Sequence, residues 1–148
     1  MANKKAVRKF FTEEQEGQII NAIREAELNT SGEIRVHIEE KCGANALDRA
    51  TAVFNQLNMD ATKLRNGILF YLATKDHKFS IIGDQGINDK VPDDFWDHIR
   101  DDMQNAFRQG KFTEGLCNGI EATGKALKEF FPYQDDDINE LPDSISTS

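Results

Sequence analysis

The sequence predicts an α/β fold, a three-layer α/β/α sandwich with a small mixed central sheet of three to four strands flanked by helices. Segments with helix-spaced apolar residues alternate along the chain with short β-like runs. One of these runs, 68–73, is apolar at successive positions, which is typical of a strand covered on both faces. A length of 148 residues suits a single domain with one core region.

The first helix is expected over residues 13–28 and the first strand over residues 33–39. Thr12 and Gln15 match a capping box, in which each side chain bonds the backbone N–H of the other residue. Helical spacing then continues through the apolar side chains Ile19, Ile20, Ile23 and Ala26. Residues 33–39 alternate instead, which predicts a strand covered on one face. We interpret His37 as a solvated side chain on the polar face of that strand.

The middle of the chain predicts a crossover followed by a hairpin. A helix over residues 46–58 joins strand 33–39 to strand 67–73, so these two strands are expected to be parallel, with a right-handed connection. The next run, 78–83, follows a turn that is long enough only for a hairpin, so it is expected to be antiparallel. His77 is interpreted as a residue of that turn.

Two further helices are expected after the hairpin. Pro92 suits the first position of one helix, and Gly110 suits the position just after its end. The last helix is expected over residues 112–131, because Pro132 cannot continue it. The residues between strand 78–83 and Pro92 are rich in glycine and carboxylates and are expected to form an irregular loop.

The domain organisation follows from these elements. We expect a basic arm at residues 1–10, a single α/β domain at 11–132, and an acidic disordered tail at 133–148. The tail contains Asp and Glu without any Lys or Arg and has few apolar residues, which is typical of a disordered segment.

Charge and cysteine content narrow the classes of partner. A formal net charge of -8 disfavours binding to nucleic acid or anionic lipid through bulk charge. No run approaches the roughly 18 apolar residues that a membrane span needs, so we expect no membrane insertion. Cys42 and Cys117 lack the spacing of a metal site, and two cysteines are too few for a disulfide framework. We therefore expect both cysteines to be reduced thiols in a cytoplasmic protein. We also expect a monomer, and the sequence does not identify a protein partner.

The strand directions gather oxygen-bearing side chains at one edge of the sheet. The start of strand 67–73 should lie beside the start of strand 33–39 and beside the end of strand 78–83. Crowded carboxylates repel one another unless a cation binds, and oxygen ligands suit calcium, which we expect in preference to magnesium. No His or Cys is expected at this edge, which argues against zinc or copper. The candidate metal ligands are Glu33, Asn66, Asp84, Asn88, Asp89, Asp93 and Asp94.

The same residues also have a purely structural interpretation. Asp84 would cap a turn, and Asn88 and Asp89 would be ordinary turn residues. Asp93 and Asp94 would offset the dipole of the following helix. The residues by themselves leave the two interpretations open.

Between Phe11 and Phe131 the chain resembles the TPM domain family, that of the thylakoid-lumen acid phosphatase-like proteins. The resemblance rests on the segments FTEEQEGQIINAI, SGEIRVHI, RNGILFYLATKDHKFSIIGDQGI and FRQGKFTEGLCNGI, together with the helix of Trp96. It implies an α/β/α sandwich, calcium binding in some members and acid phosphatase activity in others. By position, the acidic loop of the family falls on Asp84 and Asp89, with Asn66 and Glu33 as neighbours.

The chain departs from the family pattern in two respects. The usual G-x-G after the third strand is Gly83-Asp84-Gln85-Gly86 here, with an extra residue and a carboxylate. Many members also carry a signal peptide and a membrane anchor, whereas this sequence is expected to be a stand-alone domain.

Three functions are therefore considered. The first is a divalent-metal-binding domain, calcium being the expected ion, in which the metal orders the Gly/Asp-rich loops and modulates a partner interaction. The second is a metal-assisted acid phosphatase acting on phosphate esters, with an Asp as nucleophile or base. The third is a metal-independent protein-interaction domain.

Overall fold

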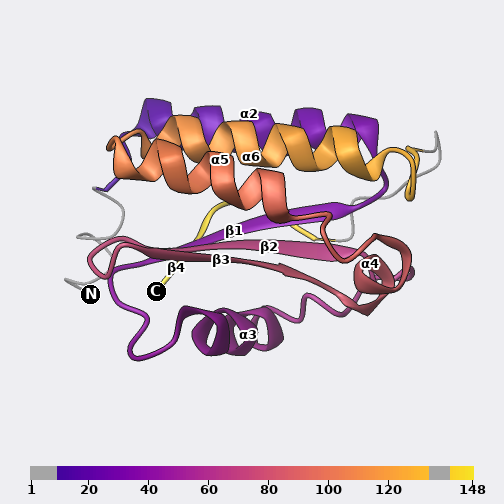
Figure 1. The fold of residues 1–148 in the computed structure, drawn as a ribbon, viewed down its shortest axis with the longest axis horizontal. Coiled ribbons are helices and arrows are strands. Elements are labelled where there is room, and N and C mark those ends of the chain that lie inside the picture. The colour runs from indigo at the N-terminus through magenta and orange to yellow at the C-terminus, as the bar shows by residue number, and fades with distance from the viewer. Residues whose placement is uncertain (1–9, 134–140) are drawn as a thin grey trace.

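The computed structural model describes residues 10–133 and 141–148, which form three layers (Figure 1). The central sheet has helices α2, α5 and α6 on one face and α3 on the other, which confirms the α/β/α sandwich (Figure 1). The elements in chain order are α2 (Glu13–Asn29), β1 (Glu33–Glu39), α3 (Ala46–Gln56), β2 (Gly67–Ala73), β3 (Lys78–Gly83), α4 (Gln85–Lys90), α5 (Asp97–Arg108), α6 (Phe112–Leu127) and β4 (Ser146–Thr147).

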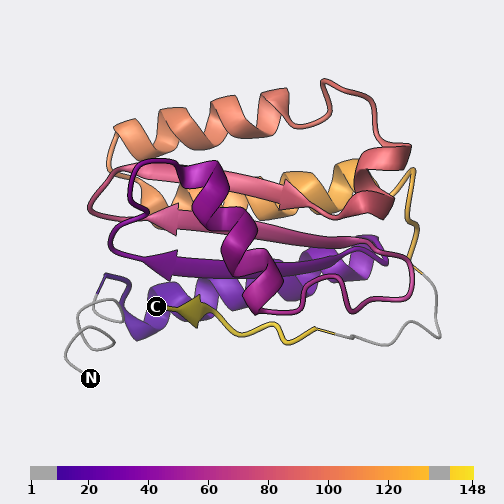
Figure 2. The same ribbon diagram turned by 90° about the horizontal axis from the view of Figure 1, so that it is seen from below.

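The strand order in the sheet is β3-β2-β1-β4 (Figure 2). β1 and β2 are parallel, with Glu33 opposite Gly67, and β2 and β3 are antiparallel, with Ile68 opposite Gly83. Both predicted strand directions are therefore confirmed. His77 lies in the β2–β3 turn with a positive φ of 53°, so the prediction of a turn residue at this position is also confirmed.

The C-terminal segment differs from the expected disordered tail. Residues 134–140 lie outside the described residues, but residues 141–148 run along β1, and β4 pairs with it in parallel. His37 lies opposite Ser146, and the backbone N–H of Ser148 donates to the carbonyl of Ile38. The acidic composition predicted disorder, whereas the chain reaches an open edge of β1 whose backbone groups accept a further strand.

β1 is buried along its whole length, so the prediction of a half-covered strand is wrong. The apolar face of β1 lies beneath α2 and α6, as the alternation suggested. The polar face is covered by α3 and the C-terminal segment. His37 is consequently 2% exposed instead of solvated. Alternation reports which face is apolar, but not what covers the polar face.

The helix boundaries follow local capping. The capping box of Thr12 and Gln15 is present at the start of α2. α5 begins at Asp97, later than the expected start at Pro92, because residues 92–96 form a turn before the helix. The segment expected to be an irregular loop contains a short helix, α4, which Asp84 caps.

Each face of the sheet carries its own hydrophobic core. Residues of β1 and β2 pack against α2, α5 and α6 on one side, while Leu69 and Tyr71 of β2 pack against α3 on the other. β2 is buried at all of its positions, which confirms a strand covered on both faces. Gly124 allows α6 to lie against α2, since a Cβ there would be 2.8 Å from the Cα of Ala26.

Candidate functional site

One edge of the sheet brings together several of the predicted ligand positions. The register places Glu33 beside Gly67, and Gly67 in turn follows Asn66. On the other side of β2, Gly83 ends β3 and is followed by Asp84. We call this edge the rim; it is bordered by the crossing segment (residues 58–66) and the acidic segment (residues 84–94).

Asp84 joins the two segments. Its carboxylate is 6% exposed and accepts hydrogen bonds from Nε and one terminal nitrogen of Arg65, at 2.8 and 2.9 Å. It also accepts the backbone N–H of Gln85 at 2.8 Å and so caps α4. Its hydrogen bonds, and then its charge, raise the pKa of Arg65. The contacts of Asp84 therefore match the capping interpretation. Its ion pair with Arg65 was not predicted from the sequence.

The crossing segment touches the acidic segment at Gly86. The backbone N–H of Gly86 donates to the carbonyl of Arg65 at 2.9 Å. A Cβ on Gly86 would lie 2.6 Å from that carbonyl oxygen and still closer to the carbonyl oxygen of Leu64. Only glycine allows the two backbones to approach this closely.

Glu33 and Asn66 are buried, at 4% and 2% exposure, and bond to backbone groups. Glu33 accepts the backbone N–H of Leu141 at 2.9 Å, which holds the C-terminal segment at the rim. Asn66 donates from its side-chain amide to the carbonyl of Ser31 at 3.1 Å, and its own carbonyl accepts from the backbone of Glu33. In the structure both side chains organise the backbone at the rim.

The remaining candidates are exposed and stay in solvent. Asn88 donates to the carbonyl of Gly83 at 3.0 Å. Asp89 lies on α4, while Asp93 and Asp94 lie in the turn before α5. Within residues 10–133 and 141–148, no group of three or more His, Cys, Asp or Glu side chains is arranged to hold a metal ion.

Sequence reasoning missed a second polar cluster, on the α3 side of β1. Glu39 is 4% exposed and accepts two hydrogen bonds from Arg49 of α3 and one from the hydroxyl of Tyr71. His37 lies parallel to the ring of Tyr71, and its two ring nitrogens contact the hydroxyls of Ser146 and Ser148 at 2.9 and 2.7 Å. Burial lowers the pKa of His37, against the opposing effect of Glu39.

Arg35 lies on the same face of β1 as His37 and Glu39. It is 8% exposed, its Nε atom makes no hydrogen bond to any residue within 10–133 and 141–148, and burial lowers its pKa. The signal in the sequence was the alternation of charged residues in strand 33–39, which indicated a polar face. That signal did not show that α3 and the C-terminal segment cover this face.

Both cysteines are free thiols, as predicted. Burial raises the pKa of Cys42, and burial also raises the pKa of Cys117 to about 11. None of the helices in the part of the chain that the structure describes is long and apolar enough to cross a membrane.

Comparisons with known proteins agree with this architecture. The family model of the TPM domain matches residues 6–126. The NMR structure of the BA42 protein from the psychrophilic bacterium Bizionia argentinensis is 54% identical, with a TM-score of 0.90 over 94% of this chain and 96% of that chain. No curated protein matches the chain.

Two more distant structures share the fold. The N-terminal domain of a P. gingivalis protein is 23% identical, with a TM-score of 0.67 over 82% of this chain and 78% of that one. The N-terminal domain of the cg2496 protein from Corynebacterium glutamicum is 13% identical, with a TM-score of 0.64 over 93% and 80% of the two chains. With the family model matching most of its length, and with the three-layer fold in place, the chain belongs to the TPM domain family.

Proposed function

We propose that this TPM domain binds a divalent cation, calcium in preference to magnesium, between the crossing segment and the acidic segment. The cation orders the two segments relative to each other and thereby modulates how the rim contacts a protein partner. The observation that carries the proposal is the environment of Asp84. Its side chain is 6% exposed, yet its counter-ion is the guanidinium of Arg65, which is 47% exposed.

The guanidinium occupies the place that a cation would take. Arg65 binds both oxygens of Asp84, and calcium also binds a carboxylate through both oxygens, at about 2.3–2.6 Å. Calcium and Arg65 therefore compete for one carboxylate. An arginine whose side chain is half exposed can move into water while the ion takes its position.

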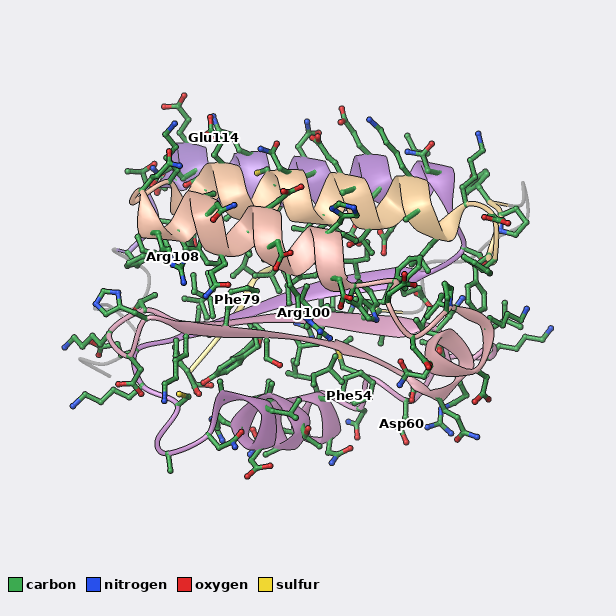
Figure 3. The ribbon with its side chains drawn as sticks, viewed as in Figure 1. Phe54, Asp60, Phe79, Arg100, Arg108 and Glu114 are labelled. Atoms are coloured by element: carbon green, nitrogen blue, oxygen red, sulfur yellow. The ribbon has the colours of Figure 1, made fainter. Side chains whose placement is uncertain are left out.

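Further oxygens lie on the crossing segment near Arg65 and Gly86. Asp60, on the crossing segment, acts electrostatically on Arg65 and lies at the same end of the molecule as α4 (Figure 3). The backbone carbonyls of Leu64 and Arg65 meet the acidic segment at Gly86. Calcium takes six to eight oxygens, carbonyls and water included, with flexible geometry, whereas magnesium requires a near-octahedral set.

The acidic segment supplies mobile ligands in this proposal. Asp89, Asp93 and Asp94 are exposed, and their side chains form no ion pair within residues 10–133 and 141–148. Binding draws one or more of them toward Asp84 after Arg65 has left. The bound ion reduces the mutual repulsion of the carboxylates, which favours the arrangement in which the acidic segment lies against Asp84.

Isothermal titration calorimetry with calcium and with magnesium tests the proposal. Asp84→Asn should abolish binding, because it removes the buried carboxylate. Arg65→Gln should tighten calcium binding by about tenfold, because the competing guanidinium is gone. The matched control is Asp48→Asn, which changes an exposed carboxylate of α3 and should leave the affinity unchanged.

Two outcomes would contradict a calcium site at Asp84. One is the absence of both heat and amide shifts in the wild-type protein, and the other is weaker calcium binding in Arg65→Gln. Partner capture that is insensitive to a chelator would favour the metal-independent interaction domain. Calcium-dependent hydrolysis of a chromogenic phosphate ester, lost in Asp84→Asn, would favour the phosphatase.

A further inference from the structure

A cavity of about 670 Å³ lies at the opposite end of the sheet from the rim, between β3, the end of α5 and the start of α6. Its volume falls within the range of roughly 300–1,000 Å³ that is common for small-molecule sites. Figure 3 shows Phe79 on β3 and Arg108 on α5 at this end of the molecule. None of the candidate metal ligands lines it.

Aromatic side chains and a leucine form the apolar wall of the cavity. Phe79 and Phe107 pack edge to face with ring centroids 5.1 Å apart, and Phe107 stacks on Phe112 at 5.4 Å. Leu72 lies opposite Phe79 on the neighbouring strand and also lines the cavity. Because these rings hold one another in place, the wall is formed without a ligand.

The polar lining carries positive charge. His77, Lys78, Gln104 and Arg108 line the cavity, and none of the described lining residues is Asp or Glu. This is notable in a chain with 26 acidic and 18 basic residues. The cavity is therefore a local cationic site on an acidic protein.

Among the described residues, the two cations, Lys78 and Arg108, have no close counter-ion. Neither Lys78 nor Arg108 forms a salt bridge with any residue that the structure describes. Asp76 acts electrostatically with Lys78 at longer range, but the carboxylate of Asp76 accepts the backbone N–H of Cys42 at 2.8 Å. A ligand anion would supply the close partner that these side chains lack.

We propose that the cavity binds an amphipathic organic anion, an apolar body that carries a single carboxylate or phosphate group. The apolar body lies against Phe79, Phe107 and Phe112, and the anionic group lies between Lys78 and Arg108. Electrostatic attraction at the mouth selects anions over neutral or cationic molecules of the same shape. Two positive charges in one small cavity suit a small molecule and not a polyanion.

A matched ligand series tests this inference on the full chain in the presence of a chelator. Octanoate, octyl phosphate, 1-octanol and octylammonium share one apolar chain and differ only in the head group. Amide shifts in two-dimensional NMR titrations should locate the anions at β3, the end of α5 and the start of α6. The two anions should bind about tenfold more tightly than 1-octanol, and octylammonium should bind most weakly.

Charge variants then identify the residues involved. The double change Lys78→Glu and Arg108→Glu should weaken octanoate binding by about tenfold or more. The neutral double change Lys78→Gln and Arg108→Gln should give a smaller loss and serves if the reversed charges disturb folding. Arg100→Glu alters the same helix at a residue outside the lining and should leave the affinity unchanged.

The relative affinity for octanoate and octyl phosphate distinguishes a carboxylate ligand from a phosphate ligand. Equal affinity for 1-octanol and octanoate would overturn the inference, since the cavity would then be an apolar groove without selection for charge. Shifts at other sites, or the absence of binding by either anion, would also overturn it. Because a chelator is present, none of these outcomes depends on the proposed calcium site.

Discussion

Arg49 and Glu39 form a bidentate ion pair that connects α3 to β1, with N–O distances of 2.7 and 2.8 Å. The hydroxyl of Tyr71 donates to the same carboxylate. Burial would raise the pKa of Glu39, but these hydrogen bonds outweigh burial and the pKa is lowered. The pair therefore stabilises the fold above the unfolded pKa of this carboxyl, and its contribution is lost as the pH falls through the lower, folded value.

Removal of one partner should be costly. Arg49→Ala leaves the charge of Glu39 in a site that is 4% exposed, so we expect a loss of about 3 kcal/mol in the free energy of unfolding. Urea denaturation at neutral pH measures it. Lys75→Ala is the matched control, because Lys75 is 63% exposed in its ion pair with Glu40 and its loss should cost no more than about 1 kcal/mol. Equal losses in the two variants would contradict the role of burial.

The pKa shift of Glu27 predicts that stability depends on pH in the opposite direction to the effect of Glu39. Burial, together with a hydrogen bond to Asp143, raises the pKa of Glu27 from 4.5 to about 9. The folded protein keeps a proton that the unfolded chain releases, so this group lowers the free energy of unfolding as the pH rises from 4.5 to about 9. Its contribution is fully present below pH 4.5.

Glu27→Gln should keep the neutral form of this side chain at every pH. We expect the variant to be more stable than the wild type at pH 8 by about 1–3 kcal/mol, and to lose the decline between pH 5 and 9. Thermal and urea unfolding across that range give the comparison. Glu25→Gln changes an exposed residue of the same helix and should follow the wild type. A variant that is less stable than the wild type at pH 8 would refute a neutral carboxyl at this half-buried position.

Gly86→Ala should separate the crossing and acidic segments. The added methyl group would meet the carbonyl oxygens of Leu64 and Arg65, so we expect a loss of about 1–3 kcal/mol in stability. Gly17→Ala is the control: no described residue outside its own helix has an atom within 4 Å of its Cβ position on α2, so alanine should stabilise that helix by about 0.5–1 kcal/mol. Hydrogen exchange of α4 should increase only in Gly86→Ala, and unchanged exchange there would argue against the close crossing.

Leu141 anchors the C-terminal segment. It is 6% exposed in the core on the α3 side of the sheet, so Leu141→Ala should cost about 2–4 kcal/mol and increase hydrogen exchange at the edge of β1. Leu28→Ala removes a leucine that is 67% exposed and should change stability by less than about 0.5 kcal/mol. Unaltered exchange of the β1 amides in Leu141→Ala would show that the segment does not protect this edge.

The parts of the fold that were predicted correctly depend on local pattern. Thr12 and Gln15 cap α2 because both partners lie within one helical turn. The directions of β1, β2 and β3 follow from the lengths of their connections, and the apolar run of β2 requires cover on both faces. Each of these conclusions uses residues that are neighbours in the chain.

The candidate site could be predicted only in part, because its contacts join distant residues. The strand directions placed Asp84 at the rim, but its pairing with Arg65 depends on the path of the crossing segment. The cavity beside Phe79 likewise forms only because α5 and α6 pack near β3, an arrangement that no local sequence pattern specifies.

The sequence by itself determined the three layers, the family and the strand directions that bring Glu33 and Asp84 to one edge of the sheet, since hydrophobic period and connection length act over short stretches of chain. Only the tertiary structure decided which polar side chains meet: Arg65 pairs with Asp84, Arg49 pairs with Glu39, and His37 contacts the serine hydroxyls of the C-terminal segment. The physical reason is that an ion pair or a buried polar contact depends on distance in space and on exclusion of water. Both are properties of the packed molecule, and neither can be read from spacing along the chain.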